Sequence, residues 1–284
     1  MKRLFFILLF LLSNLHVQSQ TRHAVVVGIS NYPTPSGWHH ISGANDIDII
    51  LPMLHANQFS LTNVCILRDN QATKNRIINE IHMVIDKVSD GDIVYFHFSG
   101  HGQLVNDIDG DEGNYGYDES IVPYDAQKSY KEGIYTGENH IVDDELNSLL
   151  WKIKQKIGCQ GRLIVVLDAC HSGGGSRDEA SLSRGVQDIF ELPKPLRINT
   201  KSSQNIDWVC ISACKSTQNN YEYLAPDGMC YGRLSWAISR VFHTQQTPAE
   251  LLKCLTDQYN IMPSRYPQEP ILDCNDGLSL VPLM

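Results

Sequence analysis

The amino-acid sequence predicts an α/β fold in which a mostly parallel, six-stranded sheet carries helices on both faces. The first observation behind this prediction is that short, β-branched apolar runs alternate with longer segments of helical periodicity. The second is that these runs are apolar at consecutive positions, which is typical of strands buried on both faces of a parallel sheet. Strands and helices can then form successive crossover units, and residues 20–284 are expected to form one domain.

The elements are expected in a regular order along the chain. Strands are predicted where apolar runs are bounded by turn residues, at 23–29, 64–69, 92–100, 162–170, 208–214 and 278–283. Helices are predicted in the periodic segments, at 44–58, 73–89, 142–157, 232–244 and 247–260. Thr73 and Thr247 are predicted N-caps, because a threonine hydroxyl can accept a hydrogen bond from the first helical turn. Pro52 predicts that the first helix is kinked or starts later.

Residues 1–19 have the pattern of a secretory signal peptide. A basic start is followed by the nine-residue apolar segment LFFILLFLL and by a polar stretch that ends at Ser19. The apolar segment is too short to span a bilayer. We therefore expect an exported protein, periplasmic or extracellular, with no stable membrane insertion.

The net charge limits the classes of binding partner, and the cysteine content bears on disulfide bonds. The formal net charge is −9, which argues against nucleic acid, because binding to nucleic acid needs clustered Lys and Arg. An acidic chain fits basic peptides or cations better. The spacing of the eight cysteines matches no disulfide framework, so most are expected to be buried and reduced. The sequence also allows one or two disulfide bonds. We expect a monomer with no organic cofactor.

Two predicted strands end in residues that can perform nucleophilic catalysis. FHFSGHG places His101 at the end of one strand, and LDACHSGG places Cys170 at the end of another. Neighbouring parallel strands would bring the imidazole and the thiol to the same edge of the sheet, where His101 could act as general acid/base and Cys170 as nucleophile. The backbone N–H groups of Gly102 and Cys170 are candidate donors to an oxyanion.

The neighbouring histidines offer two other roles for these residues. His171 is a rival base, but residues adjacent on a strand point apart, which favours His101. A zinc site built from His97, His101, Cys170 and His171 would not have the spacing of known zinc motifs.

Two aspartates are candidates for a pocket beside the thiol. Asp168 precedes Cys170 by two residues, so both side chains leave an extended strand on the same face. A carboxylate there would raise the pKa of the thiol unless a cation lay between them, and a substrate Arg or Lys would supply that cation. Asp46 is a second candidate for this pocket. It could equally be an acidic residue that stabilises the N-terminus of the first helix.

Two long stretches, 102–141 and 171–206, fall outside the alternation and are expected to be functional or disordered loops. In the first, Asp107, Asp109, Asp111 and Asp118 occupy positions one, three, five and twelve of a calcium-loop pattern. Glu112 stands where that pattern requires glycine, so the segment is not an EF-hand. The carboxylates could bind a hard cation such as Ca²⁺ or could simply be solvated.

Several motifs taken in order resemble those of the metacaspases and their bacterial caspase-like relatives. FHFSGHG is similar to the histidine motif of that family and LDACHSGG to its cysteine motif; DGDEGNYGYDESIVPYD, IVDDEL and VCISACKSTQNNYEY resemble the segments between and after them. The resemblance extends from about residue 23 to residue 242. It implies a caspase-like fold and makes residues 20–284 a peptidase domain.

The resemblance also implies roles for individual residues. It implies a cysteine endopeptidase with a His101/Cys170 dyad that cleaves after Arg or Lys, with Asp46, Ser99 and Asp168 in the pocket for the basic side chain. It further implies Ca²⁺ dependence, with carboxylate ligands at four matching positions: Asp118, Asp143, Asp144 and Asp178.

A basic-specific peptidase could also cut itself. Arg177 and Arg184 follow the candidate nucleophile in a Gly/Ser-rich segment, where they are either self-cleavage sites or solvated charges. The alternative to an enzyme is an inactive caspase-like module that binds calcium or a partner. The retention of both His101 and Cys170 argues against it.

Overall fold

A computed structural model describes residues 20–106, 117–170, 183–185, 189–191, 207–243, 246–264 and 266–275. The expected signal peptide lies outside the described residues, as do His171, Arg177, Asp178 and the loop aspartates at 107, 109 and 111.

A six-stranded sheet forms the centre of the structure, in the order β11-β8-β7-β3-β1-β2. Five of its strands are parallel: β1 (Arg22–Gly28), β2 (Val64–Arg68), β3 (Ile93–Ser99), β7 (Arg162–Asp168) and β8 (Val209–Ser212). The sixth, β11 (Ile271–Asp273), pairs with β8 in the antiparallel sense. The mostly parallel sheet is thus confirmed. The sequence did not predict β11, and the strand predicted at 278–283 lies outside the described residues.

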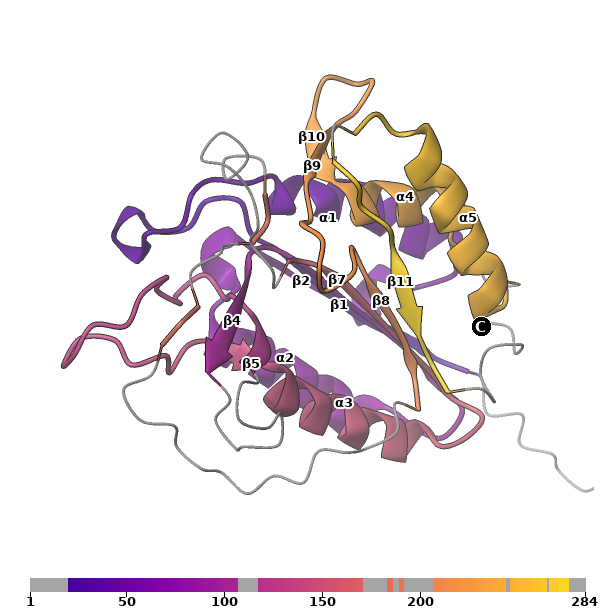
Figure 1. Cartoon of the computed structure of the whole chain (residues 1–284). Coiled ribbons are helices and arrows are strands. Elements are labelled where there is room, and N and C mark those ends of the chain that lie inside the picture. Colours follow the sequence, from indigo (N-terminus) through magenta and orange to yellow (C-terminus); the bar gives the residue numbers. More distant parts are fainter. Residues whose placement is uncertain are drawn as a thin grey trace, which may run out of the picture.

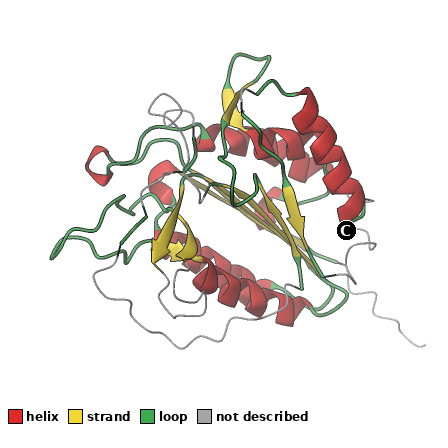
Figure 2. Ribbon diagram, viewed as in Figure 1, coloured by secondary structure: helices red, strands yellow, loops and turns green. Residues whose placement is uncertain are grey.

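Helices cover both faces of this sheet, as predicted (Figures 1 and 2). On one face lie α1 (Gly43–Ala56), α4 (Arg233–Val241) and α5 (Pro248–Ile261), and on the other α2 (Lys74–Lys87) and α3 (Asp143–Ile157). The hydroxyls of Thr73 and Thr247 accept hydrogen bonds from the first turns of α2 and α5, which confirms both N-caps. Pro52 lies inside α1, so it does not mark the start of that helix.

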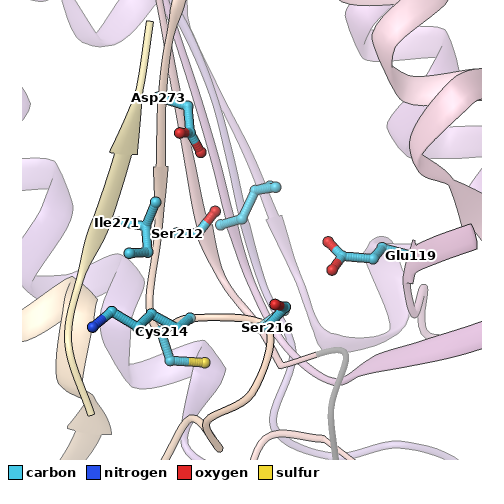
Figure 3. Close-up of a pocket in the computed structure, with 9 residues that line it drawn as sticks. Glu119, Ser212, Cys214, Ser216, Ile271 and Asp273 are labelled. Carbon is cyan, nitrogen blue, oxygen red and sulfur yellow. The ribbon is translucent and has the colours of Figure 1, made fainter.

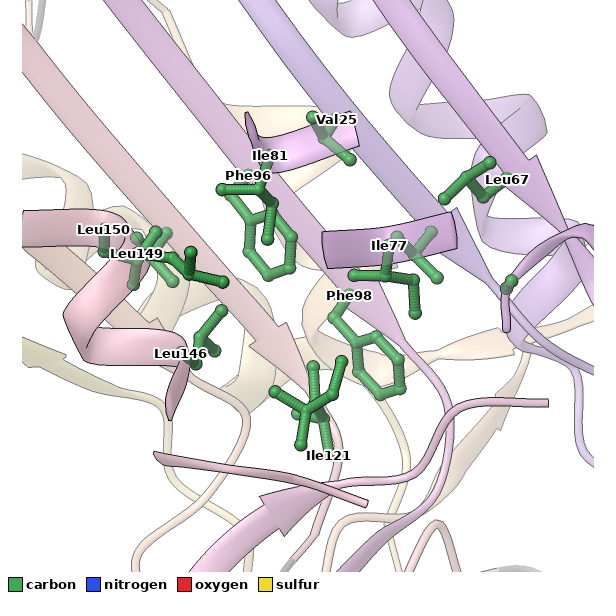
Figure 4. Packing of buried hydrophobic residues seen from close by; sticks show 14 of the residues in the cluster. Val25, Leu67, Ile77, Ile81, Phe96, Phe98, Ile121, Leu146, Leu149 and Leu150 are labelled. Carbon is green, nitrogen blue, oxygen red and sulfur yellow. The ribbon is translucent and has the colours of Figure 1, made fainter. Parts of the chain in front are cut away.

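The strands are buried on both sides, and each face of the sheet has its own core. Figure 4 shows the core beneath α2 and α3, where Phe96 and Phe98 of β3 meet Ile77 and Ile81 of α2 and leucines of α3. The opposite core packs β1, β3 and β7 against α1, α4 and α5. This double burial explains the continuously apolar strands. Because the five strands are parallel, their carboxyl ends lie at one edge of the sheet.

Two small sheets and three short 3₁₀ turns complete the described fold. An antiparallel sheet contains β4 (Gly102–Asn106), β5 (Tyr117–Ile121) and β6 (Ile141–Val142), and a hairpin contains β9 (Glu222–Leu224) and β10 (Cys230–Gly232). The 3₁₀ turns span Thr34–Ser36, Leu61–Asn63 and Asp69–Gln71. The first sheet corrects the prediction that 102–141 is a loop. Among the helices of the described ranges, none is long and apolar enough to cross a bilayer.

Candidate active site

The register of β3 and β7 brings His101 and Cys170 to the same edge of the sheet. β3 and β7 are parallel neighbours in which Ser99 lies opposite Asp168. His101 and Cys170 each follow two residues later, so they leave the sheet at the same edge. Both are fully buried. The arrangement expected from the sequence is therefore present.

The surroundings of His101 determine which of its ring nitrogens carries the proton. Its Nε2 lies 2.9 Å from the carbonyl oxygen of His39, which can only accept, so Nε2 donates and Nδ1 is unprotonated. Within the described residues Nδ1 is buried and has no hydrogen-bond partner. Trp38 stacks on the imidazole at 4.9 Å, and the Tyr32 hydroxyl accepts a hydrogen bond from the backbone N–H of His101. Burial lowers the pKa of His101 to about 3, so the imidazole is neutral and Nδ1 is unprotonated.

A second thiol lies beside Cys170. The thiols of Cys170 and Cys214 both approach the carbonyl oxygen of Gln218, at 3.6 and 3.3 Å. A hydrogen bond to Cys170, together with burial, raises the pKa of Cys214, which therefore stays protonated. None of the eight cysteines is in a disulfide, so the open possibility of one or two bridges is not realised in this structure.

The three residues expected to form a basic-side-chain pocket do converge, and a cation of the chain itself fills the pocket. The guanidinium of Arg184 lies 2.8 Å from Asp46 Oδ2 and 3.6 Å from Asp168 Oδ1, and it donates to the hydroxyl of Ser99. Arg184 is fully buried, so the alternative of a solvated loop charge is wrong for this residue. Asp46 lies in the pocket and also in the first turn of α1, so both of its proposed placements hold.

The pocket contains a third carboxylate that sequence reasoning missed. Glu222 pairs with Arg184 at 2.9 Å and accepts a hydrogen bond from the backbone N–H of Ser42. Burial would lower the pKa of Arg184, but attraction to Asp46, Asp168 and Glu222 outweighs it and raises that pKa. The guanidinium therefore keeps its charge although no water reaches it.

Other contacts hold the pocket carboxylates in place. Asp168 accepts hydrogen bonds from the side chain of Asn220 and from the N–H and hydroxyl of Ser235, each at 2.7 Å. Gly232 donates its N–H to Asp46 at 2.9 Å, and a Cβ on Gly232 would come within 2.1 Å of Asp168 Oδ2. Position 232 therefore requires glycine, because the pocket wall leaves no space for a side chain.

The backbone around Arg184 is bound like an extended peptide. Its N–H donates to the carbonyl of Asn220 at 2.9 Å, and its carbonyl accepts from the N–H of Gly102 at 3.0 Å. On the next residue, Gly185, a Cβ would lie 3.0 Å from Cys170 Sγ and 2.6 Å from the Cys170 carbonyl oxygen. The peptide bond between Arg184 and Gly185 therefore lies against the thiol. The N–H of Gly102, a candidate oxyanion donor, contacts the carbonyl of Arg184. The same role for the N–H of Cys170 stays a prediction.

A charged cavity of about 330 Å³ lies next to the second thiol (Figure 3). It is lined by residues of β5, β7, β8 and β11, including Glu119, Cys214 and Asp273. Leu167 and Ala169 of the β7 end line it too, and they alternate with Asp168, so the cavity and the Arg184 pocket lie on opposite faces of that strand. Cys214 thus borders open space, whereas Cys170 is covered.

The expected calcium ligands are only partly assembled. Asp143 and Asp144 begin α3, and Asp118 lies on β5. Burial raises the pKa of Asp143 to about 7, with further contributions from Asp144 and Asp118, and its Oδ1 is buried without a hydrogen-bond partner among the described residues. Nevertheless, within those residues no three His, Cys, Asp or Glu side chains are arranged to hold a metal ion.

Comparison with known proteins identifies relatives. The family described as "Metacaspase, peptidase C14 domain" matches residues 22–176. Metacaspase-1A of Aspergillus oryzae is 27% identical over 91% of this chain and 68% of its own length, and Metacaspase-1 of Sclerotinia sclerotiorum is 26% identical over 92% of this chain and 67% of its own.

Solved structures agree with these matches at the level of the fold. Protein GSU0716 from Geobacter sulfurreducens superposes with a TM-score of 0.62 at 20% identity, covering 93% of this chain and 98% of its own. Caspase-1 from Spodoptera frugiperda gives 0.59 at 14% identity, covering 93% and 88%. The caspase-like fold expected from the sequence is thus confirmed.

Proposed function

We propose that this chain, a cysteine-type peptidase that belongs to the metacaspase family (peptidase C14 domain), hydrolyses peptide bonds that follow Arg or Lys. The observation that carries the proposal is the position of Arg184. Its guanidinium lies between Asp46 and Asp168 while its carbonyl is bound by Gly102 beside Cys170. A substrate arginine bound in the same way would present its carbonyl carbon to the thiol.

The proposed reaction follows from the two reactive side chains. Nδ1 of His101 takes the proton of the Cys170 thiol, and the thiolate attacks the carbonyl carbon that follows the basic side chain. The resulting oxyanion is stabilised by the N–H of Gly102 and, as we propose, by that of Cys170. His101 then gives its proton to the departing amine, which leaves an acyl thioester on Cys170. Water, deprotonated by His101, hydrolyses the thioester and restores the thiol.

The pocket favours Arg over Lys for geometric reasons. Asp46 and Asp168 approach one Nη of Arg184, whereas Glu222 contacts Nε and the other Nη, and the planar guanidinium can donate to several acceptors at once. An ammonium group is a compact charge and cannot reach all three carboxylates. We propose that both basic residues are accepted and that Arg is preferred.

A panel of fluorogenic peptides tests the specificity. Peptides that end in Arg, Lys or Asp before the reporter are incubated with the protein, and we expect turnover in the order Arg, Lys and then Asp. Turnover of the Asp peptide alone would contradict the proposed pocket. The absence of any turnover would favour the alternative of an inactive binding module.

Self-cleavage after Arg184 is the first prediction. The Arg184–Gly185 bond is bound as a substrate would be, so we propose that the chain cuts itself there, and N-terminal sequencing of incubated protein should find a new end at Gly185. The cut is expected to be first-order and independent of protein concentration, because the segment belongs to the same chain.

Two variants sharpen this measurement. Gly185→Ala should slow the cut strongly while keeping Arg184, because its Cβ would come within 2.6 Å of the Cys170 carbonyl. Arg177→Gln is the matched control and should leave the cut after Arg184 in place. If Gly185→Ala cuts as fast as the unchanged chain, the docked segment is not the substrate. Cleavage after Arg177 remains a separate proposal that the same sequencing tests.

Calcium binding at the start of α3 is the second prediction. We propose that Ca²⁺ binds through Asp118, Asp143, Asp144 and Asp178 and promotes activity. Burial, together with repulsion from Asp144 and Asp118, raises the pKa of Asp143, and a bound cation would relieve that repulsion and contact its buried Oδ1, although the described carboxylates are not gathered around one point. A bound cation would supply charge neutralisation there and take no part in the bond-breaking steps.

Thermal unfolding and peptide turnover, each with and without calcium, check this prediction. Calcium at about 100 times its Kd should add about 2.7 kcal/mol to the free energy of unfolding and so raise Tm. Asp143→Asn should lose most of that response, whereas Asp48→Asn, an exposed aspartate on α1, should keep it. An unchanged Tm at every calcium concentration would exclude the site.

A further inference from the structure

The segment that follows Arg184 contacts the body of the protein a second time. Beyond Gly185, which forms a parallel bridge to Gly102, the described residues include 189–191. There the N–H of Phe190 donates to the carbonyl of Leu104 at 2.8 Å, and the carbonyl of Phe190 accepts from the N–H of Asn106 at 3.3 Å. Phe190 thereby forms a parallel bridge with Val105. The segment thus adds to the edge of β4 in the manner of a bound peptide.

The side chain of Phe190 fills a closed apolar site, which we call the Phe190 socket. Only 1% of Phe190 is exposed. Its ring meets the ring of His140 at 4.7 Å and that of Tyr135 edge-on at 5.7 Å, and it belongs to the same buried cluster as Val105 and Ile121. Three residues, Val105, Tyr135 and His140, define the socket.

Hydrogen bonds hold the aromatic wall of the socket in place. His140 is bound at both ring nitrogens, by the Tyr135 hydroxyl and by the side chain of Gln103, each at 2.9 Å. Burial lowers the pKa of His140 to about 3, so this wall is uncharged. The socket is therefore a preformed site for an aromatic ring, and its walls come from β4 and from the segment before α3.

The socket is continuous with the candidate active site. β4 supplies Gly102, which binds the carbonyl of Arg184, and three residues later it supplies Val105, which pairs with Phe190. One strand edge therefore binds the chain at the bond to be cut and again on its leaving-group side. The anchor on that side, Phe190, is the sixth residue after Arg184.

We propose that the Phe190 socket is a substrate subsite on the leaving-group side of the cut, selective for an aromatic residue six positions after the cleaved Arg. The proposal rests on the proposed Arg-directed peptidase activity. In the uncut chain the subsite holds Phe190 and positions the Arg184–Gly185 bond. In the cut chain the subsite binds the residue that stands six positions after the cleaved Arg of a protein substrate. That residue competes with the tethered Phe190.

Peptides that carry the chain's own sequence test the subsite. The probe is a quenched fluorescent peptide with the sequence of residues 181–193, SLSRGVQDIFELP, compared with the same peptide carrying Ala at the Phe190 position. A third peptide with Ala at the Ile189 position is the matched control, and a short peptide that ends at Arg before its reporter cannot reach the socket. Each protein is preincubated under identical conditions before the substrates are added.

The informative enzyme is the Phe190→Ala variant, in which the socket is vacant. On this variant the Phe peptide should be cleaved with a kcat/KM about tenfold or more above that of the Ala peptide, since the ring becomes fully buried. The unchanged enzyme should discriminate less between the two peptides, because its own tethered Phe190 competes at high effective concentration. Replacing the peptide's Phe by Tyr or Trp should retain part of the preference, as expected for an aromatic site.

Self-cleavage provides a second readout that a purely structural role for Phe190 would not reproduce. The rate of the cut after Arg184, divided by the turnover of the short Arg peptide on the same protein, should fall about tenfold in Phe190→Ala and recover in Phe190→Trp. Equal cleavage of the Phe and Ala peptides by Phe190→Ala would overturn the subsite while leaving the peptidase intact. Failure to cleave even the short Arg peptide, by the unchanged protein, would overturn the proposed function and the subsite together.

Discussion

Replacement of Cys170 by alanine is expected to lower turnover of Arg peptides by about 10³-fold or more and to leave the chain uncut at Arg184. The reason is that, among the described residues of the site, no other group is placed to form the acyl intermediate. Cys214 is close, but without Cys170 its burial and the nearby carboxylates of Asp168 and Glu119 still raise its pKa, so it carries too little thiolate to replace the nucleophile. Turnover of the short Arg peptide and N-terminal sequencing measure the two effects.

The matched control for this variant is Cys159→Ala. Cys159 is an exposed thiol between α3 and β7, at the opposite end of β7 from Cys170, and its loss should leave turnover unchanged. If Cys170→Ala retained more than about a hundredth of the activity, the assignment of the nucleophile would be wrong. Cys214→Ala would then be the next variant to examine.

Asp46→Asn is the second substitution with a large expected effect. It removes one of the carboxylates that compensate a fully buried guanidinium, and breaking a buried ion pair of this kind costs about 3–5 kcal/mol. We expect kcat/KM for Arg peptides to fall by about 10²-fold or more. Asp48→Asn, two residues along the same helix and exposed, is the control and should have little effect.

The same variant has a pH signature. With Arg184 in the pocket, burial raises the pKa of Asp46 to about 6, against the opposing pull of the guanidinium. The guanidinium lowers this pKa, so at equal burial its loss makes the pKa of Asp46 higher. Arg binding therefore lowers this pKa, and the affinity for Arg should weaken as the pH falls toward 6. Asp46→Asn should remove this dependence from KM, and an unchanged pH profile would contradict the role of Asp46.

The placement of the dyad could be predicted because it depends on local pattern and sheet topology alone. Continuous apolar strands predict a parallel sheet, and parallel strands bring their carboxyl ends to one edge. His101 and Cys170 each stand two residues beyond paired positions of β3 and β7, so no further information is needed to bring them together.

Other parts of the fold and site depend on contacts between distant segments. Glu222 enters the pocket because the β9–β10 hairpin packs beside the start of α1, and its partner Ser42 is 180 residues away in sequence. Arg184 is buried only because three carboxylates from separate elements meet around it. A lone arginine in a Gly/Ser-rich segment is otherwise expected at the surface.

Short strands were missed for a related physical reason. β4 and β5 carry polar and apolar residues in pieces of five residues, and β11 has three. Such segments have little intrinsic preference for a strand, and their pairing depends on neighbours supplied by the rest of the fold. β4 nevertheless matters for the candidate site, because it provides both Gly102 and the edge along which Phe190 lies.

The location of Arg184 inside the pocket has a consequence for when the protein can act on others. A foreign chain that approaches the uncut protein meets a site already filled by a tethered occupant, whose effective concentration is on the order of millimolar. If the chain cuts itself as proposed, the intact chain is a latent form, and the slow step before any outside substrate is cut belongs to the molecule itself. Dilution would not delay that step and a higher protein concentration would not hasten it. The sequence around Arg184, rather than an encounter with a second protein, would then set the time at which activity begins.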